Sequence, residues 1–167
     1  MINKHYFVSR KGLSSLIKMK ETLRNELYRA TKEMGESVKR DNDLRENPEY
    51  MQLQTKISYE LPSKIAELGR VIEKHILIEE TDEIKNDIYD EVVPGCQVMV
   101  EDEDGNQRLF SIMGYDESEP SKGVISYLTP IAQLLLHKVI GDQIELKFQG
   151  KNLLYEIIDI RRSPELN

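Results

Sequence analysis

Apolar side chains recur every three or four residues along the first part of the chain, from Ser9 to about Arg40. The apolar members of this stripe are Leu13, Leu16, Leu23, Leu27, Ala30 and Met34. Lys20 fills the one remaining stripe position, and Ser9 stands just before the stripe, where a helix N-cap belongs. The spacing predicts a long helix with one narrow apolar stripe, which is typical of a coiled-coil partner.

A second apolar stripe of similar length follows. Its members are Tyr50, Leu53, Ile57, Leu61, Ile65, Leu68, Ile72 and Ile76. Pro62 lies inside this stripe, where it removes a backbone hydrogen bond and is expected to bend the helix. Two narrow stripes joined by a short polar segment predict an antiparallel helical hairpin with its tip near residues 41–49. Because each helix can bury its stripe only against the other, we expect the hairpin to project as a finger.

After the breaker pair Pro94-Gly95 the period of the apolar positions changes to two, which is typical of strands. Strands are predicted at residues 97–100, 108–113, 123–127, 143–148 and 153–160. Asp104-Gly105-Asn106 is a hairpin-turn signal between the first two strands, and Gly150 serves the last pair. Thr129 and Pro130 open a short helix that the pattern extends to Gly141.

These elements predict an α+β fold in three parts. Residues 1–78 form a long antiparallel coiled-coil hairpin, and residues 79–95 form an acidic connector. Residues 96–167 form a small domain built on an antiparallel sheet with one short helix.

Composition excludes several classes of protein. Cys96 is the single cysteine among 167 residues, so an internal disulfide, a cysteine zinc site and an iron–sulfur cluster are excluded. The mean hydropathy of −0.53 and the absence of a long apolar run predict no membrane span and no membrane partner. The N-terminal residues lack the apolar segment of a secretory signal, so we expect a cytoplasmic protein.

The net charge of −7 is divided unevenly along the chain. Residues 1–75 hold 15 Lys and Arg against 11 Asp and Glu, whereas residues 76–167 hold 8 against 19. The basic side chains of the first part have two interpretations, a solvated helix face or a surface that steers the hairpin towards a negatively charged site. The chain has no phosphate-binding loop, dinucleotide motif or Ser-His-Asp signature, and no motif joins its three histidines. It is therefore not expected to be an enzyme by itself.

The candidate chemistry lies at the predicted tip, where residues 41–49 hold four carboxylates and one arginine. Asp43 and Glu46, three residues apart, form a candidate site for a hard divalent cation such as Mg²⁺, which takes one or two protein carboxylates. The alternative is a helix-capping pair in which Asp43 accepts a backbone N–H. If Asn47 is the N-cap instead, Pro48 takes the favoured first helical position and both acids stay in the turn.

Four blocks of the sequence resemble the bacterial GreA/GreB family of transcript cleavage factors. They occur in the family's order and spacing, and the third leans towards the GreB branch. The blocks are V-S-R-K-G-L at 8–13, D-L-R-E-N-P-E-Y at 43–50, F-S-I-M-G-Y-D-E at 110–117, and I-S-Y-L-T-P-I-A at 125–132 followed by V-I-G-D at 139–142.

The resemblance implies an N-terminal coiled coil, an FKBP-like C-terminal domain, and RNA polymerase as the partner. In such a factor the coiled coil enters the secondary channel of the polymerase. Asp43 and Glu46 would there help to hold a Mg²⁺ of the polymerase active site, and the backtracked nascent RNA would be cut near its 3′ end. The resemblance also implies a weak contact with DNA. The FKBP-like fold does not imply prolyl isomerase activity, because a fold does not carry a function.

Two other functions stay open. Arg45, between the two acids, and Pro48, which follows Asn47, favour a regulator that occupies the same channel without stimulating cleavage. A structural coiled-coil adaptor or prefoldin-like chaperone would account for the hairpin but not for the two C-terminal blocks.

Overall fold

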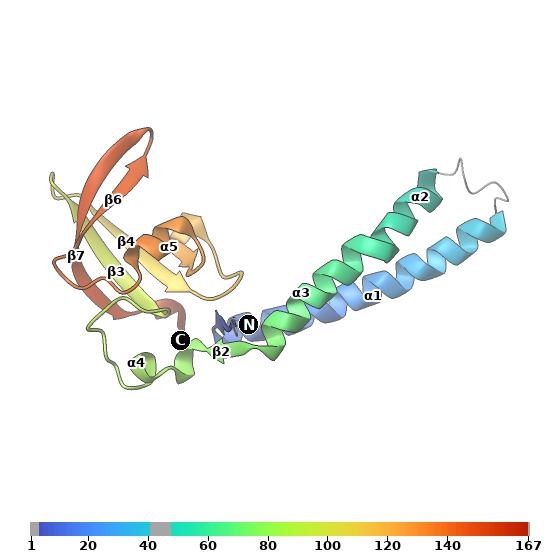
Figure 1. Ribbon diagram of the computed structural model, residues 1–167, viewed down its shortest axis with the longest axis horizontal. Coiled ribbons are helices and arrows are strands. Elements are labelled where there is room, and N and C mark those ends of the chain that lie inside the picture. The colour runs from blue at the N-terminus through green and yellow to red at the C-terminus, as the bar shows by residue number, and fades with distance from the viewer. Residues whose placement is uncertain (1–3, 41–47, 167) are drawn as a thin grey trace. The chain divides into compact units, whose positions relative to one another are not determined.

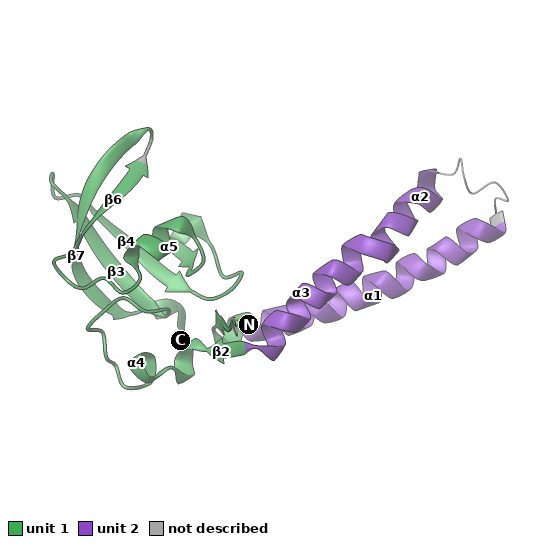
Figure 2. Ribbon diagram, in the orientation of Figure 1, with its two compact units in different colours: residues 1–12, 75–167 green, residues 13–74 purple. Residues whose placement is uncertain are grey.

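The computed structural model describes residues 4–40 and 48–166, which form two compact units. The sheet unit comprises residues 1–12 and 75–167, and the helical unit comprises residues 13–74 (Figure 2). These units divide the chain after Gly12 and after Lys74, whereas the sequence pattern places the divisions at 78 and 95. The difference arises because the first residues of the chain, and the whole acidic connector, belong to the sheet unit.

The first long helix, α1 (Arg10–Arg40), has 31 residues and begins where the pattern predicts (Figure 1). Ser9 is its N-cap, and the Ser9 hydroxyl accepts the Gly12 N–H at 2.9 Å. Leu16 and Ala30, both members of the predicted stripe, are buried. The local signals of capping and period were therefore sufficient to predict this helix.

The second long helix of the helical unit is interrupted, as Pro62 leads us to expect. It consists of α2 (Pro48–Thr55), a π-helical turn η2 (Lys56–Glu60), and α3 (Leu61–Glu73). In the π-turn the Leu61 N–H bonds the Lys56 carbonyl, five residues back. A wider turn directly before Pro62 relieves the clash that its ring makes with the preceding turn of a regular α-helix.

The two helices run antiparallel within the helical unit. Glu26 of α1 pairs with Lys56 of η2, while Lys20 lies beside Gly69 of α3. A Cβ atom on Gly69 would lie 3.3 Å from Lys20 Nζ, so glycine leaves room for the one polar residue of the first stripe. The predicted hairpin of two helices is confirmed.

The second helix ends earlier than its apolar stripe predicts. Ile76, assigned to the helix from its spacing, lies in strand β2 (His75–Leu77), which pairs in parallel with β1 (Tyr6–Val8). Lys74 leaves the helical conformation at φ −108° and ψ 24°. The two short strands satisfy each other's backbone groups, a long-range pairing that the periodicity of the helix does not reveal.

The main sheet has five strands in the order β5-β4-β3-β7-β6. Their bounds are β3 (Cys96–Asp102), β4 (Gln107–Met113), β5 (Val124–Ser126), β6 (Gln143–Phe148) and β7 (Lys151–Arg162). The pairs β3–β4, β3–β7 and β6–β7 are antiparallel, but β4 and β5 are parallel, so the expectation of a wholly antiparallel sheet is wrong at this edge. The ten-residue connection 114–123 can span up to roughly 33 Å when extended, which is enough to return the chain to the starting end of β4.

The short helix α5 (Pro130–Leu135) begins as predicted, with the Thr129 hydroxyl accepting the Ala132 N–H. It ends about one and a half turns before Gly141, so the predicted extent is wrong. His137 has a φ of +67°, and its N–H donates to the Val92 carbonyl at 2.8 Å. A hydrogen bond to the connector thus replaces the bond that the His137 N–H would make within a longer helix.

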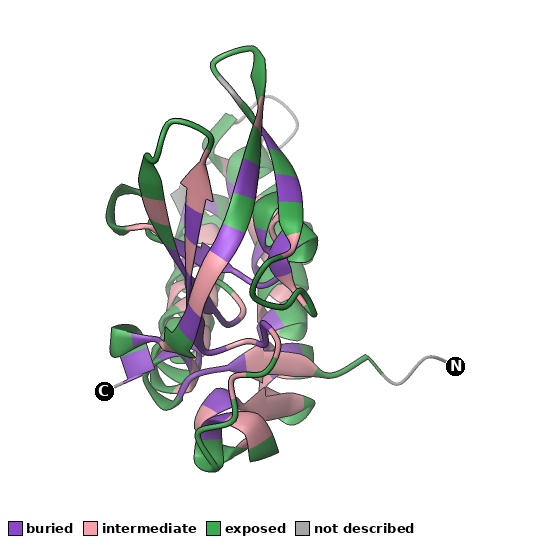
Figure 3. Ribbon diagram, turned by 90° about the vertical axis from the view of Figure 1, so that its left-hand side faces the viewer, coloured by how far each residue is buried: buried purple, intermediate pink, exposed green. Residues whose placement is uncertain are grey.

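The core of the sheet unit draws on both the sheet and the connector. The strands contribute Val98, Val100, Ile112 and Ile157, all fully buried, and buried positions recur along β7 (Figure 3). The acidic connector also contributes apolar side chains, from the short 3₁₀ turn η3 (Ile78–Glu80), from α4 (Asp82–Lys85) and from the residues that follow it. The core residues of the connector are Ile84, Val92 and Val93, and Ile78, which directly precedes the connector, joins them.

Because Leu61 is 3% exposed at the junction of η2 and α3, Leu61→Ala should destabilise the helical unit by about 2–5 kcal/mol through lost burial and a residual cavity. Urea unfolding followed by far-UV circular dichroism measures the loss. Ile17→Ala is the matched control, since Ile17 is 48% exposed, and it should change the free energy of unfolding by less than about 0.5 kcal/mol. Equal effects of the two substitutions would contradict the assigned burial.

Candidate functional site

The predicted tip residues Asp43 and Glu46, and Arg45 between them, lie outside the described residues. The structure does describe the helices on either side of the tip. The described part of helix α2 runs from Pro48 to Thr55, and Asn47, the N-cap of one alternative, lies outside the described residues. The choice between a capping role and a metal-binding role for the two acids stays a prediction.

An ion pair joins the two helices of the helical unit, with Lys56 Nζ 2.6 Å from Glu26 Oε1. The hydrogen bond from Lys56 lowers the pKa of Glu26, and the same bond raises the pKa of Lys56. Both side chains are more than a third exposed, so water and salt screen the pair. It contributes to the register of the hairpin more than to its stability.

The charges along α1 are mixed in sign. Its exposed basic residues include Lys18, Arg24, Arg29, Lys32 and Lys39. Acidic residues stand among them, of which Glu21, Glu33 and Glu36 are exposed. This alternation favours the interpretation of a solvated helix face over that of a dedicated phosphate-binding surface.

Two of the sequence blocks meet at the start of α1 within the sheet unit, where Ser9 contacts Glu117, 108 residues further along the chain. Glu117 Oε2 accepts the backbone N–H groups of Ser9 at 3.0 Å and of Gly114 at 2.9 Å. The Ser9 hydroxyl donates to Glu117 Oε1 and accepts the Gly12 N–H. We call Ser9, Gly12, Gly114 and Glu117 the helix-start cluster.

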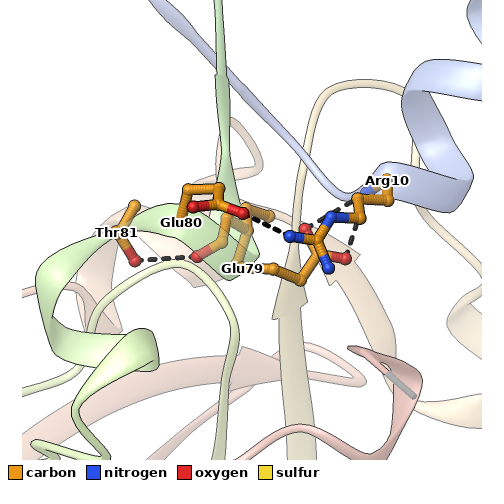
Figure 4. A network of polar contacts seen from close by, with 5 residues as sticks. Arg10, Glu79, Glu80 and Thr81 are labelled. Atoms are coloured by element: carbon orange, nitrogen blue, oxygen red, sulfur yellow. Dashed lines mark hydrogen bonds and ion pairs between the residues drawn. The ribbon is translucent and has the colours of Figure 1, made fainter.

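A second carboxylate holds the next residue of the helix start. The Arg10 N–H donates to both oxygens of Glu79, at 3.0 and 3.1 Å, and the Arg10 guanidinium bonds the carboxylate of Glu80 (Figure 4). The Thr81 hydroxyl donates to the Ile78 carbonyl at 2.8 Å and fixes the turn that carries both acids. Negative groups at a helix N-terminus are favoured, because the first N–H groups are unpaired and carry partial positive charge.

Aromatic residues connect the strand before α1 to a third sequence block. The rings of Phe7 and Tyr127 meet edge to face at 5.4 Å, and the Phe7 N–H donates to the Tyr127 hydroxyl at 3.3 Å. The Phe7 carbonyl accepts the Tyr115 N–H at 2.7 Å. Burial raises the pKa of Tyr127. Three blocks separated in sequence thus form one packed region.

A cavity of about 380 Å³ lies in the sheet unit next to this aromatic pair. Its apolar lining includes Val93 and Leu136, and Glu91 and His137 line it too, with 3.3 Å between His137 Nδ1 and Glu91 Oε1. Gln133, another lining residue, donates to the Tyr127 carbonyl at 2.7 Å. The polar side chains Glu91, His137 and Gln133 therefore interact with other residues of the sheet unit.

The described residues contain no group of three or more His, Cys, Asp or Glu side chains placed to hold a metal ion. Within the sheet unit, His75 lies in β2, His5 precedes β1, and His137 follows α5. In the part of the chain that the structure covers, no helix is long and apolar enough to cross a membrane.

An exposed apolar surface surrounds α5. Its residues are Leu128, Ile131, Leu134, Val139 and Ile140, which are 37% to 58% exposed. We call this set the α5 surface. The sequence blocks contained most of these residues, but no role was predicted for them. The surface becomes apparent only in the structure, where α5 has six residues and buries Ala132 and Leu135, so its other apolar side chains are uncovered.

Comparison with known proteins places these features in a family. The family described as "Transcription elongation factor, GreA/GreB, C-term" matches residues 85–162. The transcription elongation factor GreA of Nautilia profundicola is 32% identical over 73% of this chain and 73% of its own length. That of Desulfovibrio desulfuricans is 31% identical over 90% of this chain and 88% of its own. The chain belongs to the GreA/GreB family of transcription elongation factors.

Both of these family members bear the GreA name, so neither supports the lean towards the GreB branch. A solved structure, GreA factor homolog 1 (Gfh1) of Thermus thermophilus, covers 95% of this chain and 99% of its own. Its sequence identity of 19% and TM-score of 0.42 are too low to support an argument about function.

Cys96 is fully buried at the start of β3, and burial raises the pKa of its thiol to about 11. Because the thiolate is the reactive form, Ellman's reagent at pH 8 should label the folded protein at least about 100-fold more slowly than the unfolded chain. The labelling rate in buffer and in guanidinium chloride measures this difference. Comparable rates in the two solvents would show that the thiol is accessible.

Proposed function

We propose that this chain is an accessory factor of RNA polymerase that stimulates endonucleolytic cleavage of backtracked nascent RNA. The observation that carries the proposal is the hairpin itself, in a chain that belongs to the GreA/GreB family. Two long helices bury their stripes against each other and are joined by residues 41–47, which include Asp43 and Glu46.

The chemistry of the two tip carboxylates suits a shared metal ion. Oxygen donors are the ligands that Mg²⁺ prefers, and two carboxylates leave its other positions for water, phosphate and the partner's ligands. A Mg²⁺ so held would activate water and stabilise charge on the phosphate. Asp43 and Glu46 would supply ligands and orient the water, while the polymerase would supply the remaining ligands and the RNA.

The helices suit a role that requires reach. Helix α1 alone has 31 residues, which gives a length of roughly 45 Å at about 1.5 Å per residue. A narrow pair of helices of this length fits a channel that a globular domain could not enter. The chain itself then needs no catalytic centre, since the polymerase provides one.

The α5 surface is our proposed contact with RNA polymerase. Contiguous exposed apolar side chains on a protein surface mark a site of interaction. The sheet unit carries most of the negative charge of the chain, so the weak DNA contact implied by the family resemblance remains a prediction with little electrostatic support.

The double variant Asp43→Asn, Glu46→Gln tests the cleavage mechanism. It removes both negative ligands while keeping the side chains nearly isosteric, so we expect RNA cleavage in stalled polymerase complexes to fall by at least about 100-fold. Affinity for the polymerase should stay within about twofold. Release of short 3′ RNA from labelled transcripts measures cleavage, and undiminished cleavage would overturn the assignment of these residues.

The alternative function is a regulator that occupies the channel without stimulating cleavage, which the positions of Arg45 and Pro48 favour. The wild-type chain distinguishes the two functions when it is added to backtracked complexes over a range of Mg²⁺ concentrations. A regulator yields no short RNA product at any concentration, whereas a cleavage factor yields one.

Ile131→Asp combined with Leu134→Asp tests the α5 surface. Placing two charges in an apolar contact should weaken binding to RNA polymerase by at least about 10-fold, because buried unpaired charge is costly. Leu154→Asp is the matched control, since Leu154 is 41% exposed on β7 away from α5. Fluorescence anisotropy with labelled protein measures affinity, and equal losses in both variants would contradict the assigned contact.

A further inference from the structure

We propose that Glu117 is a positioning residue for RNA cleavage, because it restrains the first turn of the helix that leads to the acidic tip. This inference rests on the proposed function and adds a role for the helix-start cluster, which lies at the opposite end of α1 from the tip.

The carboxylate of Glu117 is held by donors from two segments of the chain. It accepts the N–H groups of Ser9 and Gly114, and it also accepts the Ser9 hydroxyl. That hydroxyl accepts the Gly12 N–H in turn, so Glu117 is connected to the backbone of the first helical turn through Ser9. Hydrogen bonds to an ionised acceptor are among the stronger ones in proteins.

The backbone around this carboxylate is shaped to receive it. A Cβ atom on Gly12 would lie 2.5 Å from the carboxyl carbon of Glu117. A Cβ atom on Gly114 would lie 2.6 Å from the Cα atom of Val8. Gly114 therefore permits a close approach of two backbone segments that a larger residue does not allow, whereas a side chain at position 12 would displace the Glu117 carboxylate.

A second restraint acts on the neighbouring residue. Glu79 accepts the Arg10 N–H with both of its oxygens, while the Arg10 guanidinium is engaged by Glu80. Glu79 comes from the connector and Glu117 from the connection between β4 and β5, so the helix start is held from two directions. Two points of attachment restrict rotation more than one point does.

The length of α1 makes this restraint matter for chemistry. The helix runs without interruption from Arg10 to Arg40, three residues before Asp43. A rotation of 1° at its start displaces the far end of a helix of roughly 45 Å by about 0.8 Å. A misplacement of about 1 Å in a catalytic group can reduce the rate by roughly 100-fold. A looser first turn should therefore reduce cleavage without removing any group from the tip.

Glu117→Ala tests the proposal with two independent readouts. In the free protein, hydrogen exchange at the Ser9, Gly12 and Gly114 amides should accelerate by at least about 10-fold, while exchange at the Leu27 amide in the middle of α1 stays unchanged. With backtracked complexes, the cleavage rate at saturating factor should fall by at least about 10-fold. The half-saturating concentration should stay within about twofold, because the α5 surface is untouched.

Two further variants complete the experiment. Glu119→Ala is the matched control, since Glu119 is in the same connection and its exposed carboxylate pairs with Lys122. It should leave both readouts unchanged. Glu117→Gln keeps one acceptor oxygen and should give intermediate values. If Glu117→Ala does not fold, Glu117→Gln decides the question.

The outcomes separate the two proposals. Wild-type cleavage by Glu117→Ala, with accelerated exchange at the first turn, would overturn the positioning role alone. Unchanged exchange would overturn the restraint itself. Absence of cleavage with the wild-type chain would overturn the proposed function, and the positioning role with it.

Discussion

Each long helix of the helical unit has a single narrow apolar stripe, and the stripe of the other helix covers it. This mutual burial determines how the second helix is built. The apolar residues Leu53, Ile57, Leu61 and Ile65 are spaced by four residues each time, which makes the stripe drift around a regular α-helix. The π-turn η2 has more residues per turn than an α-helix and so compensates for this drift, and Leu53 before it and Leu61 after it are both buried. Pro62 and the need to bury the stripe therefore favour the same local geometry.

The sheet unit shows a comparable dependence on distant segments. The acidic connector would be a solvated linker if charge alone decided its structure, yet Ile84 and Val92 are almost completely or completely buried in the core. The strand before α1 also belongs to this unit, through β2 and through Phe7 against Tyr127. The carboxylates of the connector lie at the helix start, where they stabilise its unpaired N–H groups.

The division of charge is consistent with a factor that acts inside a larger enzyme. A protein that binds nucleic acid directly requires an excess of basic residues on the contact surface, whereas the sheet unit here is acidic and the exposed face of α1 is mixed. A partner that supplies the nucleic acid and most of the metal ligands removes that requirement. For the proposed function, the remaining requirement is precise placement of the tip, to which we infer that the helix-start cluster contributes.

The sequence by itself determined the features that depend on neighbouring residues. Period, capping and turn chemistry within a few residues predict the start of α1 and its Ser9 cap, the strand hairpins and the start of α5. The role of the two tip acids stays a prediction. Only the tertiary structure decided the parallel pairs β1–β2 and β4–β5 and the contact of Glu117 with Ser9. It also decided the early end of α5, after which the His137 N–H bonds the Val92 carbonyl. Each joins segments far apart in the chain, and their partners become identifiable only when the fold brings them together.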